Sequence, residues 1–268
     1  MNKTNTFFVI SNFNTDPEQY LEYCEDYIIY DQSTNVEIKT LLTNKNLKIE
    51  FVENTGHNIS DYFRFFIDNY DSLPQFIMLL KGNIIGRHVT QEFFNRVYTK
   101  KHHTFLYDDR NFKENPGIAY QLYDGAFLEI NNAWYRNAKP YKYFETYNDL
   151  LRFAFKNPIV PKWLIFSPGA CYIVSKEQVI QYPKAFYENL KYLISYTYFP
   201  SEAYHVERML HVIFSGVYEL NDHMFDQNKF NLALQLVNIQ SPNFKNNASI
   251  KFKFINEIFQ RLKHKFNF

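Results

Sequence analysis

The sequence has few cysteines, no long apolar run and almost no net charge, and each absence excludes a class of protein. Its two cysteines, Cys24 and Cys171, cannot form a disulfide framework or a cysteine-based metal cluster. No stretch approaches the roughly 18 consecutive apolar residues of a membrane-spanning helix, and the N-terminal apolar run is too short for a signal peptide. A net charge of +1 gives no general attraction to nucleic acid. We therefore expect a cytoplasmic protein that binds no nucleic acid.

The common sequence motifs of enzymes are also missing. The chain has no G-x-G-x-x-G after a strand, no Walker loop, no G-x-S-x-G and no H-E-x-x-H. These absences argue against a dinucleotide-dependent oxidoreductase, a P-loop kinase and a zinc hydrolase. What the sequence does contain is 46% apolar residues and 19% aromatic residues, enough for one large core. The aromatic side chains would also suit a sugar-binding cleft, although composition alone does not show one.

Apolar runs that favour strands alternate with helical patterns in the first half of the chain. Strands are expected at 7–12, 27–30, 47–52 and 76–80, and helices from Asp16-Pro17 and over 58–70. This alternation predicts an α/β fold with a mainly parallel sheet flanked by helices.

After residue 83 the pattern loosens into a long loop region. The later expected elements are a strand at 126–130, a strand-like stretch at 163–174, and helices at about 184–196, 201–214 and 229–239. The simplest division is one domain over 1–220 and a helical C-terminal extension over 221–268.

Polar residues follow each of the first four expected strands. They are Ser11 and Asn12, then Asp31, then Asn54-Thr55-Gly56-His57, then Lys81-Gly82-Asn83. Because ligands of open parallel sheets bind outside the carboxyl ends of the strands, these groups are expected to meet at one edge. The helix that starts near Asn58 would point its N-terminal amides there, where a phosphate could bind. Such a surface suits a nucleotide diphosphate. Each residue alone is more typical of a turn or a cap, and it is the convergence of all four groups that favours a binding site.

A second polar group lies in the C-terminal half. Ser167-Pro168-Gly169-Ala170 precedes a strand, and small residues there allow a ligand to approach the backbone closely. On the helix expected at 201–214, Glu207 and His211 are four residues apart and share a face, whereas adjacent Glu207 and Arg208 are expected to point apart. A carboxylate on this helix could serve as a general base. Alternatively, Glu207 or Arg208 belongs to a buried ion pair that anchors the helix.

The order of these pieces resembles the nucleotide-binding half of nucleotide-sugar glycosyltransferases of the GT-A fold. The closer resemblance is to a glycosyltransferase-like family that occurs in bacterial polysaccharide loci and in fungi. It covers most of residues 7–215 and is carried by three blocks: NTGHNISDYFRFFIDNYDSLPQFIMLLKGN with His88 after it, FSPGACYIVSKEQVIQYPKAFYENL, and PSEAYHVERMLHVIF.

The resemblance implies a GT-A-like, Rossmann-like fold and transfer of a sugar from a nucleotide-sugar donor to a capsule or lipooligosaccharide glycan. It implies that Ser11, Asn54, Gly56 and His57 contact the donor nucleotide, that Lys81, Asn83 and His88 face the diphosphate or sugar, and that Glu202 or Glu207 serves the acceptor. The alternative is a non-catalytic glycan- or nucleotide-sugar-binding assembly protein with the same fold.

The sequence departs from the GT-A pattern at the metal motif. Lys81-Gly82-Asn83 has no carboxylate where these enzymes carry Asp-x-Asp. Either the enzyme works without a metal, with Lys81 or Arg87 neutralising the diphosphate, or a carboxylate elsewhere binds Mn²⁺ or Mg²⁺. The candidates for that carboxylate are Asp108, Asp109 and Asp124.

The last 20 residues are basic and follow a helical apolar spacing. Five Lys and Arg residues stand there against Glu257 alone, around apolar residues such as Phe254, Ile258 and Leu262. A basic amphipathic helix can lie on an anionic membrane surface, which would make the protein peripheral at the inner face of the membrane. The alternative is an ordinary helix that packs on the core.

Overall fold

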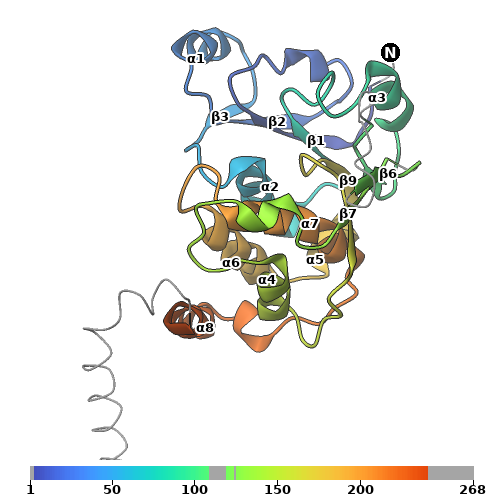
Figure 1. Ribbon diagram of the computed structural model, residues 1–268. Coiled ribbons are helices and arrows are strands. Elements are labelled where there is room, and N and C mark those ends of the chain that lie inside the picture. The colour runs from blue at the N-terminus through green and yellow to red at the C-terminus, as the bar shows by residue number, and fades with distance from the viewer. Residues whose placement is uncertain (1–2, 109–118, 124, 241–268) are drawn as a thin grey trace, which may run out of the picture.

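The computed structural model, which describes residues 3–108, 119–123 and 125–240, is built on a six-stranded sheet (Figure 1). The strands lie in the order β3-β2-β1-β4-β9-β5. Their bounds are β1 Phe7–Asn12, β2 Tyr27–Asp31, β3 Ile49–Phe51, β4 Phe76–Lys81, β5 Thr104–Phe105 and β9 Tyr172–Ser175. The first four pair in parallel, whereas β9 is antiparallel to β4 and β5. The prediction of an α/β fold with a mainly parallel sheet is confirmed.

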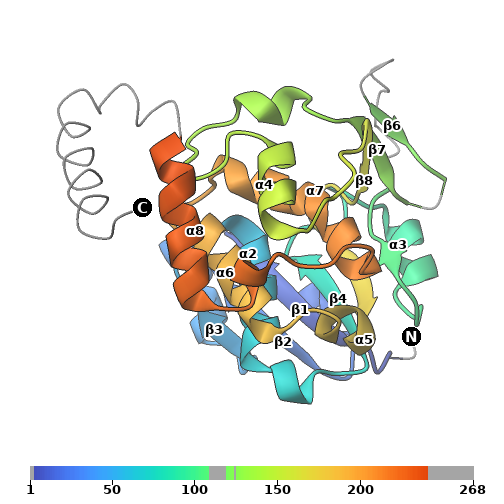
Figure 2. The same cartoon turned by 90° about the horizontal axis from the view of Figure 1, so that it is seen from below.

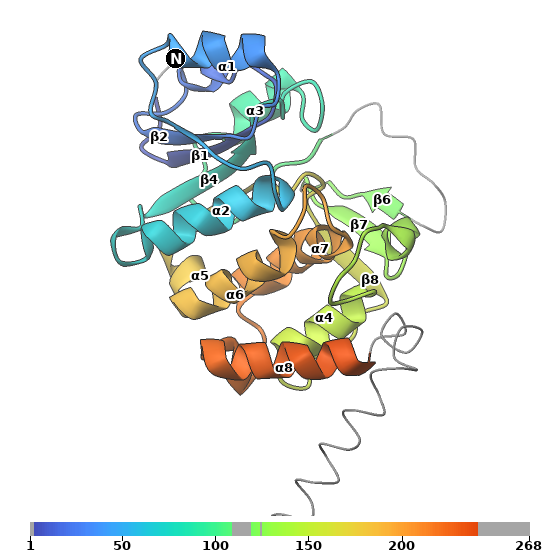
Figure 3. The same cartoon turned by 90° about the vertical axis from the view of Figure 1, so that its left-hand side faces the viewer.

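Helices cover both faces of this sheet, with α1 and α3 on one side and α2, α6 and α7 on the other (Figures 1 and 3). Their bounds are α1 Val36–Thr43, α2 His57–Asp68, α3 Gln91–Val97, α6 Lys184–Ile194 and α7 Ser201–Ser215. The two faces explain the continuous apolar run of β1. Phe8 and Ile10 pack in the core on the α3 side, whereas Val9 packs in the core on the α2 side. A strand that is buried on both faces carries no polar alternation.

A second, antiparallel sheet lies beside α7 (Figure 2). It contains β6 Ala119–Gln121, β7 Phe127–Ile130 and β8 Trp163–Phe166, with β7 in the middle. The strand character expected at 163–174, with a strand after Ser167–Ala170, is present as the two strands β8 and β9, which belong to different sheets. The turn between β8 and β9 makes this possible, since Gly169 (φ 84°) and Ala170 (φ 57°) adopt the left-handed conformation and redirect the chain.

The boundaries of other elements also differ from the sequence prediction. The helix expected from Asp16-Pro17 is only a 3-10 turn at Glu18–Tyr20, because the chain turns back so that Cys24 bridges to Thr4 ahead of β2. Three helices lie in segments where none was expected: α1, α3 and α4 (Tyr147–Ala154). The short helix α5 (Lys176–Ile180), which follows directly on β9, was not expected either.

The described part of the C-terminal extension packs into the main core. Phe230 and Leu234 of α8 (Gln227–Gln240) are buried in the cluster that holds Leu190 of α6 and Met209 of α7. The basic segment 249–268 lies outside the described residues. Within the described residues, every helix is too short or too polar to cross a membrane.

Candidate functional site

A cavity of about 470 Å³ opens at the carboxyl edge of the main sheet. Its lining comes from the end of β4 with the turn after it, the start of α2, the second sheet with the β8–β9 turn, the loop between α6 and α7, and the middle of α7. The polar side chains that line it are His57, Lys81, Arg87, His88, Glu129, Glu207 and Arg208. The aromatic side chains that line it are Tyr107, Phe127, Trp134, Phe166, Phe199 and Tyr204. The cavity therefore combines the cations Lys81 and Arg87 with carboxylates and flat apolar faces.

Lys81 brings an unbalanced positive charge to this cavity. Among the described residues Lys81 makes no ion pair, and burial lowers the pKa of its ammonium group, with Arg87 adding to the effect. Burying a cation without a partner is unfavourable, so an anion bound beside Lys81 would relieve that penalty. Arg87 lines the same cavity and is exposed. The pair forms a candidate anion-binding site.

His57 and His88 lie next to Lys81 but are neutral. Burial and the charge of Lys81 lower the pKa of both imidazoles to about 3. His57 stacks on Phe199 with ring centroids 4.2 Å apart, and a Cβ on Gly169 would come within 3.0 Å of the His88 ring. Both histidines can therefore donate or accept hydrogen bonds near neutral pH, but neither adds positive charge.

Glu207 reaches the cavity from α7 and has the properties of a general base. Its Oε1 accepts a hydrogen bond from the Gly169 amide at 2.7 Å, and its Oε2 lies 3.1 Å from Nη1 of Arg208. Burial raises the pKa of this carboxyl, an effect that Arg208 and the Gly169 amide oppose. A raised pKa increases the basicity of the carboxylate, while the two contacts fix its orientation.

Arg208 shares the cavity with Glu207, although adjacent helical residues were expected to point apart. Its guanidinium folds back along α7, where Nη1 also donates to the Tyr204 carbonyl at 3.2 Å. This direction follows from the tilt of helical side chains toward the N-terminus and from the length of arginine. The expectation is thus wrong for this pair. Instead His211, the expected partner of Glu207, packs its ring against His103 and Phe105.

The Arg208 guanidinium is held in a buried cage. Nε donates to Glu129 of β7 at 2.7 Å, and both side chains are at most 3% exposed. Its carbon lies 4.0 Å from the Tyr135 ring centroid and 4.5 Å from that of Phe166. The buried ion pair considered for this helix is therefore present, and it joins α7 to the second sheet.

Glu202, the other carboxylate predicted to serve the acceptor, lies elsewhere. Its Oε1 accepts the backbone amides of Lys142, Tyr143 and Phe144 at 2.6–3.2 Å, and its Oε2 accepts the Tyr196 hydroxyl at 2.8 Å. It is fully buried and does not line the cavity. Glu202 anchors the loop before α4, so of the two predicted carboxylates only Glu207 lines the cavity.

The strand ends converge as predicted, but some of their side chains line the cavity and others are buried. The pairing of Ser11 with Lys81 and of Asn12 with Asp31 places the ends of β1, β2 and β4 side by side. Lys81 lines the cavity, whereas Asn12 donates to Asp31 at 2.8 Å and is completely buried. Of these residues only Lys81 therefore lines the cavity.

Ser11 is also buried. It binds the carboxyl of Asp61, a residue that sequence reasoning missed. Its hydroxyl donates to Oδ2 of Asp61 at 2.6 Å, and Gln32 donates to the same oxygen at 2.9 Å. Asp61 lies on α2 and is 2% exposed, and burial raises its pKa to about 7. Ser11 therefore fixes α2 against the sheet and does not line the cavity.

We expect Asp61→Asn to remove a pH dependence of stability. The carboxyl binds more protons folded (pKa about 7) than unfolded (pKa near 3.8), so stability falls as the pH rises through this window. The difference amounts to about 4 kcal/mol at full ionisation. Denaturant unfolding at about pH 5 and about pH 8 covers roughly two pKa units of this window, so a fall of about 2.7 kcal/mol is expected between these two measurements. The control Asp68→Asn, exposed on the same helix, keeps the wild-type dependence; an unchanged dependence in Asp61→Asn would contradict this assignment.

The backbone around the start of α2 is hydrogen-bonded to the loop between α6 and α7. The amides of Gly56 and His57 donate to the Thr197 and Tyr198 carbonyls at 2.9 and 3.1 Å. The loop between α6 and α7 therefore occupies two of the amides at the end of the helix that was expected to face a phosphate. Asn54 and Asn83 are partly buried and do not line the cavity.

Asn58, which sequence reasoning did not single out, ties α2 to the β8–β9 turn. Its amide nitrogen donates to the Gly169 carbonyl at 2.8 Å and to the Tyr62 hydroxyl at 2.9 Å. The same turn presents the Gly169 amide to Glu207. An asparagine at the second position of a helix gives no sequence signal for such a contact.

The described residues offer no set of ligands for Mn²⁺ or Mg²⁺. No three His, Cys, Asp or Glu side chains among them gather in a way that could hold a metal ion. Lys81 stands at the end of β4, and Asp108 accepts a hydrogen bond from Thr90 at 3.2 Å without lining the cavity. Asp109 and Asp124, the other predicted ligands, lie outside the described residues.

The fold and the site together define an α/β protein with a cationic, aromatic-lined cavity at the carboxyl edge of a mainly parallel sheet. Residues 9–228 match the family model described as "Protein of unknown function (DUF3431)", and the chain belongs to this family. No curated protein and no solved structure matches the chain.

Proposed function

We propose that this protein is a glycosyltransferase with a GT-A-like fold, which moves a sugar from a nucleotide-sugar donor to a growing glycan such as a capsule or lipooligosaccharide. The observation that carries the proposal is the partly buried cation Lys81, without an ion pair among the described residues, in one cavity with the carboxylate of Glu207. An anionic leaving group and an acceptor hydroxyl are the two groups that this combination would serve.

In the proposed reaction the acceptor oxygen attacks the anomeric carbon of the donor sugar. The bond from that carbon to the diphosphate oxygen breaks, and the bonding electrons leave with the nucleoside diphosphate. Lys81 and Arg87 would stabilise the charge that develops on the diphosphate. Glu207 would take the proton of the acceptor hydroxyl, which balances the exchange.

The aromatic lining supports a sugar as the transferred group. Trp134 and Tyr204 meet edge to face with ring centroids 5.0 Å apart, and Phe199 lies 4.3 Å from Tyr204. All three line the cavity beside Glu207. Flat apolar faces beside polar groups suit the C–H faces and hydroxyls of a pyranose.

Removing the charge of Lys81 tests the diphosphate assignment. We expect Lys81→Met to weaken binding of nucleoside diphosphates by about tenfold or more, because a charge-assisted contact with phosphate is lost. Isothermal titration calorimetry against a panel of nucleoside diphosphates and nucleotide sugars measures the change. The control Lys39→Met, exposed on α1, keeps wild-type affinity. The proposal is wrong if no member of the panel binds the wild-type protein.

A further inference from the structure

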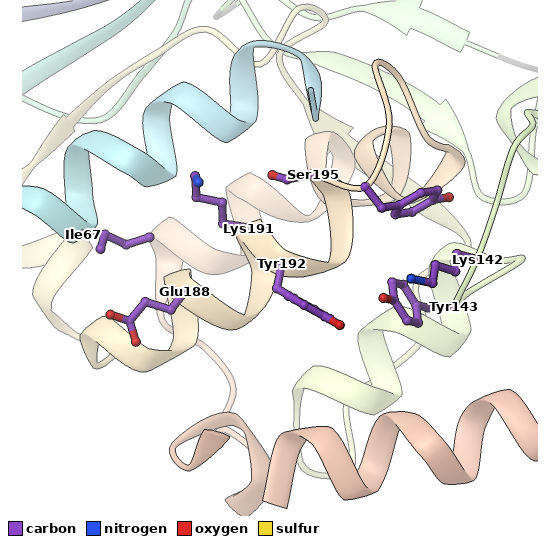
Figure 4. Close-up of a pocket in the computed structure, with 8 residues that line it drawn as sticks. Ile67, Lys142, Tyr143, Glu188, Lys191, Tyr192 and Ser195 are labelled. Atoms are coloured by element: carbon purple, nitrogen blue, oxygen red, sulfur yellow. The ribbon is translucent and has the colours of Figure 1, made fainter. Parts of the chain in front are cut away.

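A second cavity, of about 470 Å³, lies between α2, α6 and the loop before α4 (Figure 4). Figure 4 shows the Tyr192 ring extending from α6 toward Tyr143 and Lys142, whereas the Glu188 side chain extends from the same helix in the opposite direction. Tyr196 and Ser195, from the end of α6, complete that side. None of these residues lines the cavity at the sheet edge.

The aromatic wall of this cavity is held in place by Glu202. This carboxylate accepts the Tyr143 amide at 2.6 Å and the Tyr196 hydroxyl at 2.8 Å, so both tyrosines are anchored to one buried group. The Tyr143 and Tyr196 rings meet edge to face with centroids 5.9 Å apart. The ring centroid of Tyr192, a side chain that is 51% exposed, lies 6.1 Å from that of Tyr143. The wall is therefore formed before any ligand arrives, which lowers the entropy lost on binding.

The cavity carries one net positive charge. Lys142 places its ammonium 5.0 Å from the Tyr143 ring centroid and 5.7 Å from that of Tyr196. Lys191 also lines the cavity, and burial together with Arg64 lowers the pKa of its ammonium group. Among the described residues neither lysine makes an ion pair, and Glu188 is the one anion of the lining.

The loop between α6 and α7 contributes residues to the lining of both cavities. Tyr196 lines the second cavity and Phe199 lines the first, so their Cα atoms are at most about 11 Å apart. The Ser195 hydroxyl meets that of Ser60 at 3.1 Å, and Phe199 stacks on His57. A short oligosaccharide whose end reaches Glu207 could therefore extend along this loop into the second cavity.

We propose that the second cavity binds an acidic sugar, a pyranose bearing a carboxylate, within the acceptor glycan. The identity of the glycan as an acceptor rests on the proposed function, whereas the binding of the acidic sugar does not. The tyrosine rings pack on the C–H faces of the pyranose, and Lys142 donates to the carboxylate. The Ser195 hydroxyl accepts a hydrogen bond from a sugar hydroxyl.

The test measures binding of an oligosaccharide of alternating glucuronic acid and glucose, compared with the same oligosaccharide after reduction of its carboxyl groups. Titration followed by protein NMR or calorimetry gives both affinities. We expect the acidic form to bind about tenfold more tightly, the advantage of one charge-assisted contact. Lys142→Ala removes this preference, and Tyr192→Ala weakens both forms. Two controls outside the cavity, Lys184→Ala on α6 and Phe225→Ala, which is as exposed as Tyr192, bind as the wild type does.

Two results overturn the proposal: equal affinity of the wild type for the two forms, or a preference that survives in Lys142→Ala. Failure of the proposed function has a different signature. In that case nucleotide sugars do not bind, while the acidic oligosaccharide still binds and still loses its preference in Lys142→Ala. The variant Lys81→Met provides the converse check, because it is expected to lose nucleotide binding and to keep oligosaccharide binding.

Discussion

Replacing Glu207 by Gln is expected to reduce sugar transfer by about 10²–10⁴-fold while donor affinity stays the same. Gln keeps the shape of the side chain and can still accept the Gly169 amide, but it cannot take the acceptor proton. Because Lys81 and Arg87 are untouched, the donor diphosphate should bind as before. Transfer is measured as nucleoside diphosphate released in the presence of acceptor, and donor binding is measured by calorimetry.

The matched control is Glu202→Gln, on the same helix. Its carboxylate accepts three backbone amides and the Tyr196 hydroxyl, so the change should lower the melting temperature. Transfer per folded molecule should stay unchanged for a monosaccharide acceptor, which does not reach the second cavity. The two variants thus separate a chemical role from a structural one. Full transfer by Glu207→Gln would contradict the role of Glu207 as a base. Unchanged amounts of polysaccharide product in cells that carry Glu207→Gln would favour the non-catalytic binding protein.

The largest effect on stability is expected for Arg208→Met. The change leaves the carboxylate of Glu129 buried without its partner, which costs about 3–5 kcal/mol in comparable buried pairs. This is a large share of the roughly 5–15 kcal/mol that stabilises a typical domain. Denaturant unfolding measures it as a fall in the free energy of unfolding.

Two further variants show whether the buried charge is the cause. Adding Glu129→Gln to Arg208→Met removes the unpaired carboxylate and should recover part of the lost stability. Arg152→Met breaks an exposed pair with Asp149 at 3.8 Å and should change stability by no more than about 0.5 kcal/mol. Equal losses in Arg208→Met and Arg152→Met would contradict the buried-pair assignment.

Strands and helices with a clear apolar pattern could be predicted from the sequence. Two further helices are marked by N-terminal caps that the prediction overlooked. The strands β1 and β4 are continuous apolar runs, and α2 places Phe63 and Phe66 on one face. By contrast, α4 and α5 are introduced by caps at Thr146 and Ser175, which accept hydrogen bonds from Asp149 and Gln178 three residues later. These cap spacings were readable in the sequence as helix starts.

The candidate site was predicted in part. His57, Lys81, His88 and Glu207 all line one cavity. Lys81 ends a parallel strand, and such ends lie at one edge of the sheet, whereas Glu207 comes to this edge from the middle of α7. Ser11 had the same sequence position relative to its strand, yet it faces α2 and binds Asp61. The direction in which a residue at the end of a strand points depends on what packs above it, which local spacing does not encode.

The sequence alone determined the scarcity of cysteine, the near-zero net charge, the alternation of strands and helices, and the placing of polar groups at strand ends. These properties follow from composition and from local periodicity. The tertiary structure decided which groups face a ligand. It placed Glu202 under a loop and Glu207 in the cavity, although both stand on one helix, and it joined Arg208 to Glu129 across 79 residues. Such pairings depend on how distant segments pack and on which charges burial leaves unpaired.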